Sequence, residues 1–310
     1  MSAITVTDLT KRYASNGPAA VDGLSLTVEP GSIFGFLGPN GAGKTTTIKI
    51  LTGLLSATSG TARIDGLDVA RDRAGAMSRL GAVLEGSRNV YWTLSAWQNL
   101  VYFGRLKGLR RAAAGARAER LLTEIGLWDR RGEQVGTFSR GMQQQVAIAA
   151  ALIADPAVLL LDEPTLGLDV AATRAVKDRL RALARDEGKT ILLTTHQLDV
   201  VEELCDRVAV INRGRAVADL PTRELLAQSR SRDHYELRID GDADLPLPEG
   251  FTAERGENET VVSGRADDPE TLYRLIDALR AQGRRLHSVD QVRPSLETVF
   301  LTLVAEPAHA

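Results

Sequence analysis

The chain has 310 residues with almost balanced charge, 38 lysines and arginines against 40 aspartates and glutamates. This length predicts about two domains, and the lack of a basic excess argues against a protein that acts on nucleic acid. The one cysteine, Cys205, cannot form a disulfide within the chain, which fits a reducing compartment. No run reaches the roughly 18 apolar residues of a membrane span, and the first residues lack a signal-peptide pattern. The sequence therefore predicts a soluble, intracellular chain.

The larger part of the chain alternates between strand-like and helix-like patterns. Apolar residues recur either at every second position or at helical spacing, and two runs are apolar or β-branched throughout, as in parallel strands buried on both faces. In chain order the pattern predicts strands at 3–9 and 21–28, a helix at 45–54, strands at 63–66 and 80–84, helices at 113–125 and 141–154, a strand at 157–161, a helix at 170–187 and a strand at 190–194. This alternation predicts an α/β fold with right-handed crossovers.

The composition changes after about Leu226. Residues 227–232 have the composition of a linker, and strand patterns follow at 235–239 and 260–263. Asp268-Pro269 begins a helix with apolar residues on one face, and Pro294-Ser295 begins another. We therefore expect a small C-terminal α+β domain, with one domain over residues 1–228 and the second over residues 229–310.

A glycine-rich stretch between a strand and a helix fits the phosphate-binding pattern G-x-x-x-x-G-K-[ST]. Its glycines let successive N–H groups point toward one anion, and the next helix adds its positive N-terminus. In this pattern Lys44 reaches the β and γ phosphates and the Thr45 hydroxyl ligates Mg²⁺. A turn without a ligand is the alternative, which the strand and helix on either side disfavour. The predicted binding residues are Gly38, Pro39, Asn40, Gly41, Ala42, Gly43, Lys44, Thr45 and Thr46.

Polar side chains also follow two later strands. Asp162 and Glu163 end one buried run, and His196 follows the next. Ligands collect at the carboxyl edge of such sheets, so an aspartate there lies beside a metal and a neighbouring glutamate activates water. Surface ion pairs and a structural histidine are the alternatives. The common strand edge favours the catalytic interpretation.

The stretch Phe138-Ser139-Arg140-Gly141-Met142 resembles the signature sequence of ABC-type ATPases, L-S-G-G-Q. With the motifs above in the family's order, residues from about 4 to 226 resemble a complete ABC cassette. The resemblance implies a P-loop ABC-type nucleotide-binding domain with a helical subdomain, with ATP and Mg²⁺ as cofactors. Tyr13 lies where the family places a ring that stacks on adenine. An ordinary surface tyrosine is the alternative.

The resemblance also implies a mechanism. Two cassettes would pack head to tail as a homodimer, or as a pair with a similar subunit. Ser139 and Gly141 of each would contact the ATP held by the other, and Asp169 would couple the two sites. Lys44 and His196 would contact phosphate.

Within each site Asp162 and Glu163 would have different roles. Asp162 would hold Mg²⁺ through water, and Glu163 would be the catalytic base. Hydrolysis would then open the pair, as in other nucleotide switches.

Arg140, Met142 and Glu85 are the departures from the family pattern that bear on the chemistry. Arg140 and Met142 replace a glycine and the glutamine of the signature, as in the exporter branch that includes daunorubicin-resistance-type ATPases. Glu85 stands where the family has a glutamine that touches Mg²⁺ and the attacking water. An ionised carboxylate cannot donate the amide hydrogen bond and adds negative charge near Glu163. Our hypothesis is that Glu85 contacts the metal and alters pH dependence or turnover.

Five of the 14 aromatic residues fall between residues 91 and 103. In ABC transporters this region receives a short cytoplasmic helix of the membrane subunit. Aromatic side chains in a shallow groove suit such an anchor, with Tyr91 and Trp92 as the preferred contact pair. Packing inside the helical subdomain is the alternative.

The resemblance thus implies an ATP-hydrolysing subunit that powers export through a separate membrane permease. The chain would lie peripherally at the cytoplasmic face of the cell membrane and would not bind nucleic acid. Residues 294–300 resemble the ending of drug- and lipid-export ATPases, where the domain would stabilise the dimer or regulate it. A soluble ABC ATPase acting on nucleic acid or the ribosome is the alternative, disfavoured by the single cassette and the balanced charge. A simple P-loop kinase conflicts with the signature and with His196.

Overall fold

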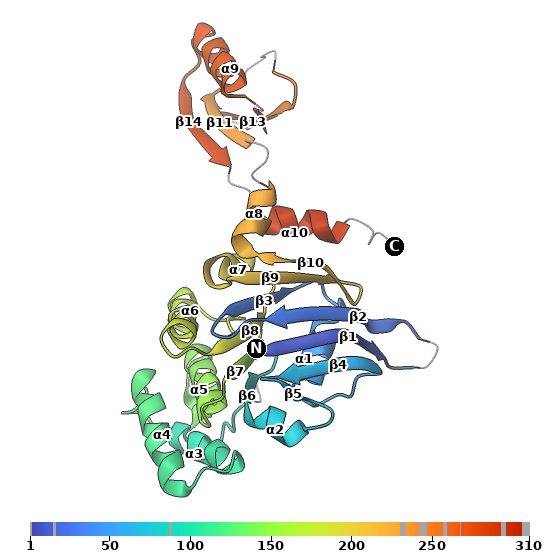
Figure 1. Cartoon of the computed structure of the whole chain (residues 1–310). Helices are drawn as coiled ribbons and strands as arrows, with labels where there is room; N and C mark the ends of the chain where they lie inside the picture. Colours follow the sequence, from blue (N-terminus) through green and yellow to red (C-terminus); the bar gives the residue numbers. More distant parts are fainter. Residues whose placement is uncertain are drawn as a thin grey trace. The chain divides into compact units, whose positions relative to one another are not determined.

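The structure, a computed structural model of the whole chain, describes residues 2–14, 17–86, 89–229, 234–241, 247–256, 259–266, 268–292 and 296–305. It divides into two compact units (Figure 1). The first contains Met1–Thr222 and Thr302–Ala310, and the second contains Arg223–Leu301. In the described residues no helix is both long and apolar enough to cross a membrane.

The centre of the first unit is a six-stranded, mostly parallel sheet. Its order is β10-β9-β3-β8-β7-β6, and only β10 runs antiparallel to its neighbour. The strands are β3 (Ile33–Leu37), β6 (Leu80–Val83), β7 (Val158–Asp162), β8 (Thr190–Thr194), β9 (Arg207–Asn212) and β10 (Arg215–Pro221). Every residue of β3, β7 and β8 is buried, as expected for parallel strands covered on both faces.

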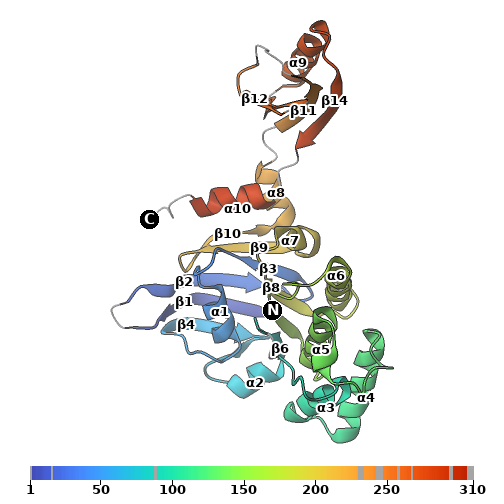
Figure 2. The ribbon, with the colours of Figure 1, turned by 180° about the vertical axis from the view of Figure 1, so that it is seen from behind.

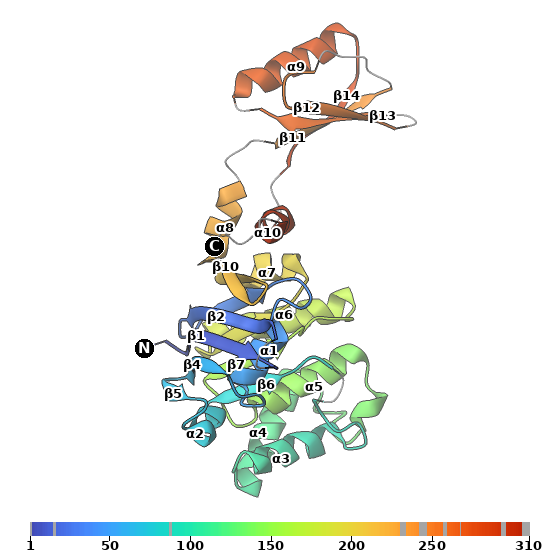
Figure 3. The ribbon, with the colours of Figure 1, turned by 90° about the vertical axis from the view of Figure 1, so that its right-hand side faces the viewer.

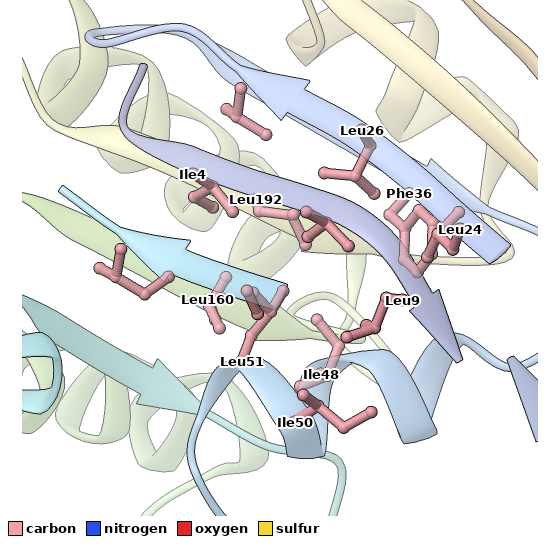
Figure 4. Packing of buried hydrophobic residues seen from close by; sticks show 14 of the residues in the cluster. Ile4, Leu9, Leu24, Leu26, Phe36, Ile48, Ile50, Leu51, Leu160 and Leu192 are labelled. Atoms are coloured by element: carbon pink, nitrogen blue, oxygen red, sulfur yellow. The ribbon is translucent and has the colours of Figure 1, made fainter. Parts of the chain in front are cut away.

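An antiparallel sheet of order β2-β1-β4-β5 packs over one face of the parallel sheet. Its strands are β1 (Ile4–Arg12), β2 (Ala19–Val28), β4 (Ser59–Ile64) and β5 (Leu67–Asp68). Side chains of this sheet, of helix α1 (Lys44–Leu51) and of the parallel strands form one apolar core (Figure 4). Leu9 and Leu24 face Phe36 in this core, and Ile48 and Leu51 close it from the helix. This core fixes α1, and thus the loop before it, against the end of β3.

Helices cover the other parts of the first unit. Two of them, α3 and α4, pack on each other and on α5, and they form the helical subdomain (Figures 1 and 2). The helices are α2 (Arg73–Ser78), α3 (Ala96–Leu106), α4 (Arg111–Glu124), α5 (Arg140–Leu152), α6 (Val170–Arg185) and α7 (Leu198–Leu204). Helix α8 (Thr222–Ser229) begins at Thr222 of the first unit, and its other residues belong to the second unit. A side chain accepts a free N–H group at four of these helix starts, with Asp72 capping α2, Ser95 capping α3, Ser139 capping α5 and Asp169 capping α6.

The second unit is a four-stranded antiparallel sheet covered by one helix (Figure 3). The sheet has the order β12-β13-β11-β14, with β11 (His234–Asp240), β12 (Phe251–Arg255), β13 (Glu259–Arg265) and β14 (Leu286–Val292). Helix α9 (Pro269–Ala281) begins after Asp268, whose carboxylate accepts the Thr271 N–H, and buries Leu275 and Leu279 against the sheet. The last helix, α10 (Leu296–Ala305), ends in the first unit, where the Asn212 amide donates to the Val304 carbonyl at 3.1 Å.

The predicted α/β fold with a helical subdomain and a small α+β unit agrees with these elements. The linker prediction is wrong for residues 227–229, because α8 continues to Ser229, and residues 230–232 lie outside the described residues. Pro294 and Ser295, predicted to begin a helix, also lie outside them. The domain boundary between residues 228 and 229 stays a prediction.

Candidate functional site

The glycine-rich loop lies between the buried strand β3 and the first residue of α1, Lys44. Gly41 and Gly43 have φ angles of 80° and 109°, in the region that favours glycine. A Cβ on Gly43 would lie 2.4 Å from the Ala20 carbonyl oxygen, and one on Gly38 would lie 2.3 Å from that of Ile211. Gly41 is therefore needed for the backbone turn, Gly38 for close packing against a neighbouring strand, and Gly43 for both.

The Lys44 ammonium folds back onto this loop. Its Nζ donates to the carbonyl oxygens of Gly38 at 2.5 Å and Pro39 at 3.1 Å. Burial lowers the pKa of Lys44, while the charges of Glu163, Asp162 and Glu85 act to raise it. The positively charged Lys44 side chain thus lies near the carboxylates of Glu163, Asp162 and Glu85.

The carboxyl ends of β7 and β8 hold the acidic residues and the histidine. Asp162 is only 5% exposed and accepts a hydrogen bond from the Thr194 hydroxyl on β8. Glu163 has a φ of 53°, and its N–H donates to the Thr194 carbonyl at 3.0 Å. Its Oε1 lies 3.0 Å from Nδ1 of His196, whereas its Oε2 is buried without a hydrogen-bond partner. This left-handed backbone thus occurs at the residue whose carboxylate contacts His196.

A cleft of about 470 Å³ joins these parts. The structure therefore brings together most of the residues that the sequence predicted. The predicted residues that line it are Asn40, Gly41, Ala42, Gly43, Lys44, Thr45, Thr46, Glu85, Asp162, Glu163 and His196. Ala20 and Leu166 also line it and were not predicted, because neither belongs to a motif with chemistry of its own.

Five predicted site residues do not line this cleft: Gly38 and Pro39 of the glycine loop, Tyr13, Ser139 and Gly141. Tyr13 is 66% exposed, and its hydroxyl lies 3.3 Å from the Thr46 hydroxyl, beside the start of α1. Ser139 caps α5, with its Oγ accepting the Met142 N–H at 3.3 Å. Gly141 packs α5 on α6, since a Cβ there would lie 2.5 Å from the Cβ of Ala172. The signature residues are thus placed on the helical side and not at their own chain's glycine loop.

The oxygen atoms of the cleft suit a magnesium ion. Thr45, Asp162 and Glu85 line it together, and so does Glu163, whose Oε2 is buried without a hydrogen-bond partner. Within the described residues, no group of three or more His, Cys, Asp or Glu side chains forms a ready-made metal cage. Mg²⁺ is usually held by one or two carboxylates together with water and substrate phosphates, and the cleft offers carboxylates and a hydroxyl for this role.

Residues 21–166 match the protein family described as ABC transporter. The daunorubicin/doxorubicin resistance ATP-binding protein DrrA of Streptomyces peucetius is 40% identical, over 99% of this chain and 93% of its own. The fluoroquinolones export ATP-binding protein Rv2688c of Mycobacterium tuberculosis is 42% identical, over 86% of this chain and 83% of its own.

Solved structures agree with these sequence relatives. CbiO1 of Clostridium perfringens, part of the ABC transporter complex CbiONQ, has a TM-score of 0.67 at 28% identity, over 74% of this chain and 92% of its own. A dimeric ATP-binding cassette in a post-hydrolysis state with ADP and Pi has a TM-score of 0.63 at 25% identity, over 71% of this chain and 99% of its own. Together with the cleft, these similarities show that the chain belongs to the ATP-binding subunits of the ABC transporter family, which are ATPases.

Proposed function

We propose that this chain hydrolyses ATP to energise export through a separate membrane permease. The single observation that carries the proposal is the cleft in which Lys44 faces Glu163 and His196, because it combines a phosphate contact with a candidate base. The names of relatives support the direction of transport, since they describe export of fluoroquinolones and of Nod factor.

Six side chains of the cleft have a role in this proposal. Lys44 leaves the Gly38 and Pro39 carbonyls and binds the β and γ phosphates. Thr45, Asp162 and Glu85 would hold Mg²⁺, which would neutralise charge on the phosphates. Glu163 accepts a proton from the attacking water, and His196 orients Glu163 through their contact of 3.0 Å and contacts the γ-phosphate.

We also propose that two chains act together, as a homodimer or as a pair with a similar subunit. Ser139 and Gly141 lie at the start of α5, apart from the residues that line the cleft of their own chain. Their N–H groups can bind phosphate only if a second cassette presents its glycine loop to them. Tyr13 would stack on the adenine of the ATP held by its own chain.

The permease would dock on exposed aromatic side chains beside the helical subdomain. Tyr91 and Trp92 are 49% and 46% exposed, and the Tyr91 ring packs edge-on against Tyr102 with 5.2 Å between centroids. Trp97 instead packs on Trp128 inside the subdomain. Tyr91 and Trp92 therefore suit an anchor for a cytoplasmic helix of the permease. The chain would then be peripheral at the cytoplasmic face of the membrane, with the C-terminal unit stabilising or regulating the dimer.

Co-purification tests this proposal directly. Membranes that contain the tagged chain should yield it with a membrane-spanning polypeptide, and the complex should hydrolyse Mg-ATP. Recovery of the active chain only from the soluble fraction, bound to ribosomes or nucleic acid, would contradict the export proposal.

A further inference from the structure

A second cavity, of about 370 Å³, lies next to the phosphate site. Residues from the loop after β6, from the first turns of α5 and from the end of β7 line it. Among the described residues of this lining, Arg140 is the one cation, and Glu85, Asp162 and Glu163 are the carboxylates. The cavity thus joins the helical subdomain to the catalytic edge of the sheet within one chain.

Arg140 is the first residue of α5 and stands where the family signature has glycine. Its Nη1 atom lies 2.8 Å from the position that a Cβ on Gly167 would occupy. Gly167 has a φ of 71°, in the turn between Glu163 and α6. The Arg140 guanidinium therefore packs against this turn at Gly167. It makes no ion pair with any residue that the structure describes.

Glu85 also lines this cavity, and hydrogen bonds hold the backbone of the residues beside it. The Asn89 side chain donates to the carbonyl oxygens of Leu84 at 2.8 Å and Gly86 at 2.9 Å, and it accepts the Leu84 N–H at 3.0 Å. These hydrogen bonds of Asn89 fix the backbone of the residues on both sides of Glu85.

The other two carboxylates of the cavity already have partners. Asp162 accepts a hydrogen bond from Thr194, and Glu163 contacts His196. Within the described part of the chain, Glu85 is the carboxylate of this cavity that has no ion-pair or hydrogen-bond partner.

We propose that Arg140 is a positioning residue that pairs with Glu85 across this cavity. The family pattern has two neutral residues at these places, a glycine and a glutamine, and here an acid and a base replace them together. Because ATP brings further negative charge to the site, the carboxylate of Glu85 adds to a charge that Lys44 alone would have to balance, and the guanidinium of Arg140 offsets it. The proposal rests on the proposed ATP hydrolysis.

A double-mutant cycle tests whether the pairing of Arg140 with Glu85 affects ATP hydrolysis. Arg140→Gly and Glu85→Gln should each lower kcat by about tenfold, while the double variant should recover to within about threefold of the unmodified chain. Arg140→Lys should keep more activity than Arg140→Gly, because it keeps the charge. Arg111→Gly changes the first residue of α4 and Glu119→Gln an exposed residue of the same helix, and both should be neutral.

Independent losses that multiply in the double variant would overturn the proposal. So would a rise in KM for ATP on Arg140→Gly that Glu85→Gln does not correct, which would mean that Arg140 contacts ATP on a second chain. An unmodified chain without Mg-ATPase activity would instead contradict the proposed function.

A second measurement needs no nucleotide. In Arg140→Cys, a cationic methanethiosulfonate should react faster than an anionic one, and adding Glu85→Gln should lower this rate ratio by about threefold. The buried Cys205 contributes little background. The ratio at Arg111→Cys should not respond to Glu85→Gln. An unchanged ratio at residue 140 would show that Glu85 does not act there and would overturn the pairing, whatever the ATPase rates.

Discussion

Glu163 and His196 meet through Oε1 and Nδ1 at 3.0 Å, while the second carboxylate oxygen of Glu163 is buried and has no hydrogen-bond partner. A buried polar atom without a partner costs about 1–3 kcal/mol. The left-handed backbone of Glu163, with φ of 53°, adds a cost of about 1–3 kcal/mol. Both costs persist at the end of a fully buried strand, as expected where a carboxylate is kept ready for an incoming water.

Replacing Glu163 with glutamine should stop hydrolysis but not binding. The amide keeps the shape of the side chain and cannot accept the proton of the attacking water, so kcat should fall by at least about 100-fold. Bound ATP should then hold two chains together. The Mg-ATPase rate and light scattering with ATP measure these effects, with Glu119→Gln on α4 as the control. Hydrolysis at the normal rate would show that another group is the base.

Replacing Lys44 with alanine should weaken nucleotide binding itself. Lys44 lies at the start of α1, inside the cleft, and a charged hydrogen bond contributes about 1.5–3 kcal/mol, which corresponds to a loss of roughly 10- to 100-fold in affinity. Titration with a fluorescent ATP analogue measures the change. Lys49 is an exposed lysine of the same helix, so Lys49→Ala is the matched control. Equal affinities for the two variants would contradict the phosphate contact.

Two glycines in helices should respond to alanine with opposite signs. At Gly141 a Cβ would lie 2.5 Å from the Cβ of Ala172, so Gly141→Ala should destabilise the α5–α6 contact by about 1–3 kcal/mol. At Gly115 the nearest atoms belong to the Trp97 ring at 3.6 Å, an ordinary contact. Gly115→Ala should therefore stabilise α4 by up to about 1 kcal/mol through helix propensity.

Thermal unfolding measures both changes, and the ATPase rate should fall only for Gly141→Ala. A rise in the unfolding midpoint for Gly141→Ala would show that α5 shifts freely. It would also show that the signature residues are not held against α6.

The sequence contains enough local information to predict the cleft. The glycine loop, the carboxylates after β7 and His196 are each fixed by a motif a few residues long, and the parallel sheet brings their strand ends together. Glu85 lines the cleft, and its role at the phosphate site, including contact with a metal, stays a prediction.

Features that depend on distant pairing could not be predicted in this way. Thr194 lies opposite Asp162 because of the register between β7 and β8, and the sequence of either strand does not reveal this register. The polar composition of residues 227–229 indicated a linker, although α8 runs through them, because composition alone does not show where a surface helix ends. Arg140 and Glu85 are 55 residues apart in the chain, and only the fold places both at one cavity.

The buried thiol of Cys205 should report unfolding of the first unit. Its side chain is 6% exposed, and its Sγ lies 3.1 Å from the position of a Cβ on Gly35. Burial, with a smaller contribution from Asp206, raises the pKa of this thiol, so less thiolate is present at a given pH. At pH 8 the folded chain should therefore react slowly with a disulfide reagent, and the chain in urea should react at once.

Nucleotide binding should raise the urea concentration at which the first unit unfolds and Cys205 becomes reactive. Mg-ATP at about 100 times its Kd stabilises the folded state by about 2.7 kcal/mol, so more urea should be needed to expose Cys205. Lys44→Ala should remove most of this shift at the same ATP concentration, while Lys49→Ala should keep it. Fast labelling of the folded chain would contradict the burial of Cys205. An unfolding midpoint in urea that ATP does not change would contradict the binding of nucleotide at the cleft.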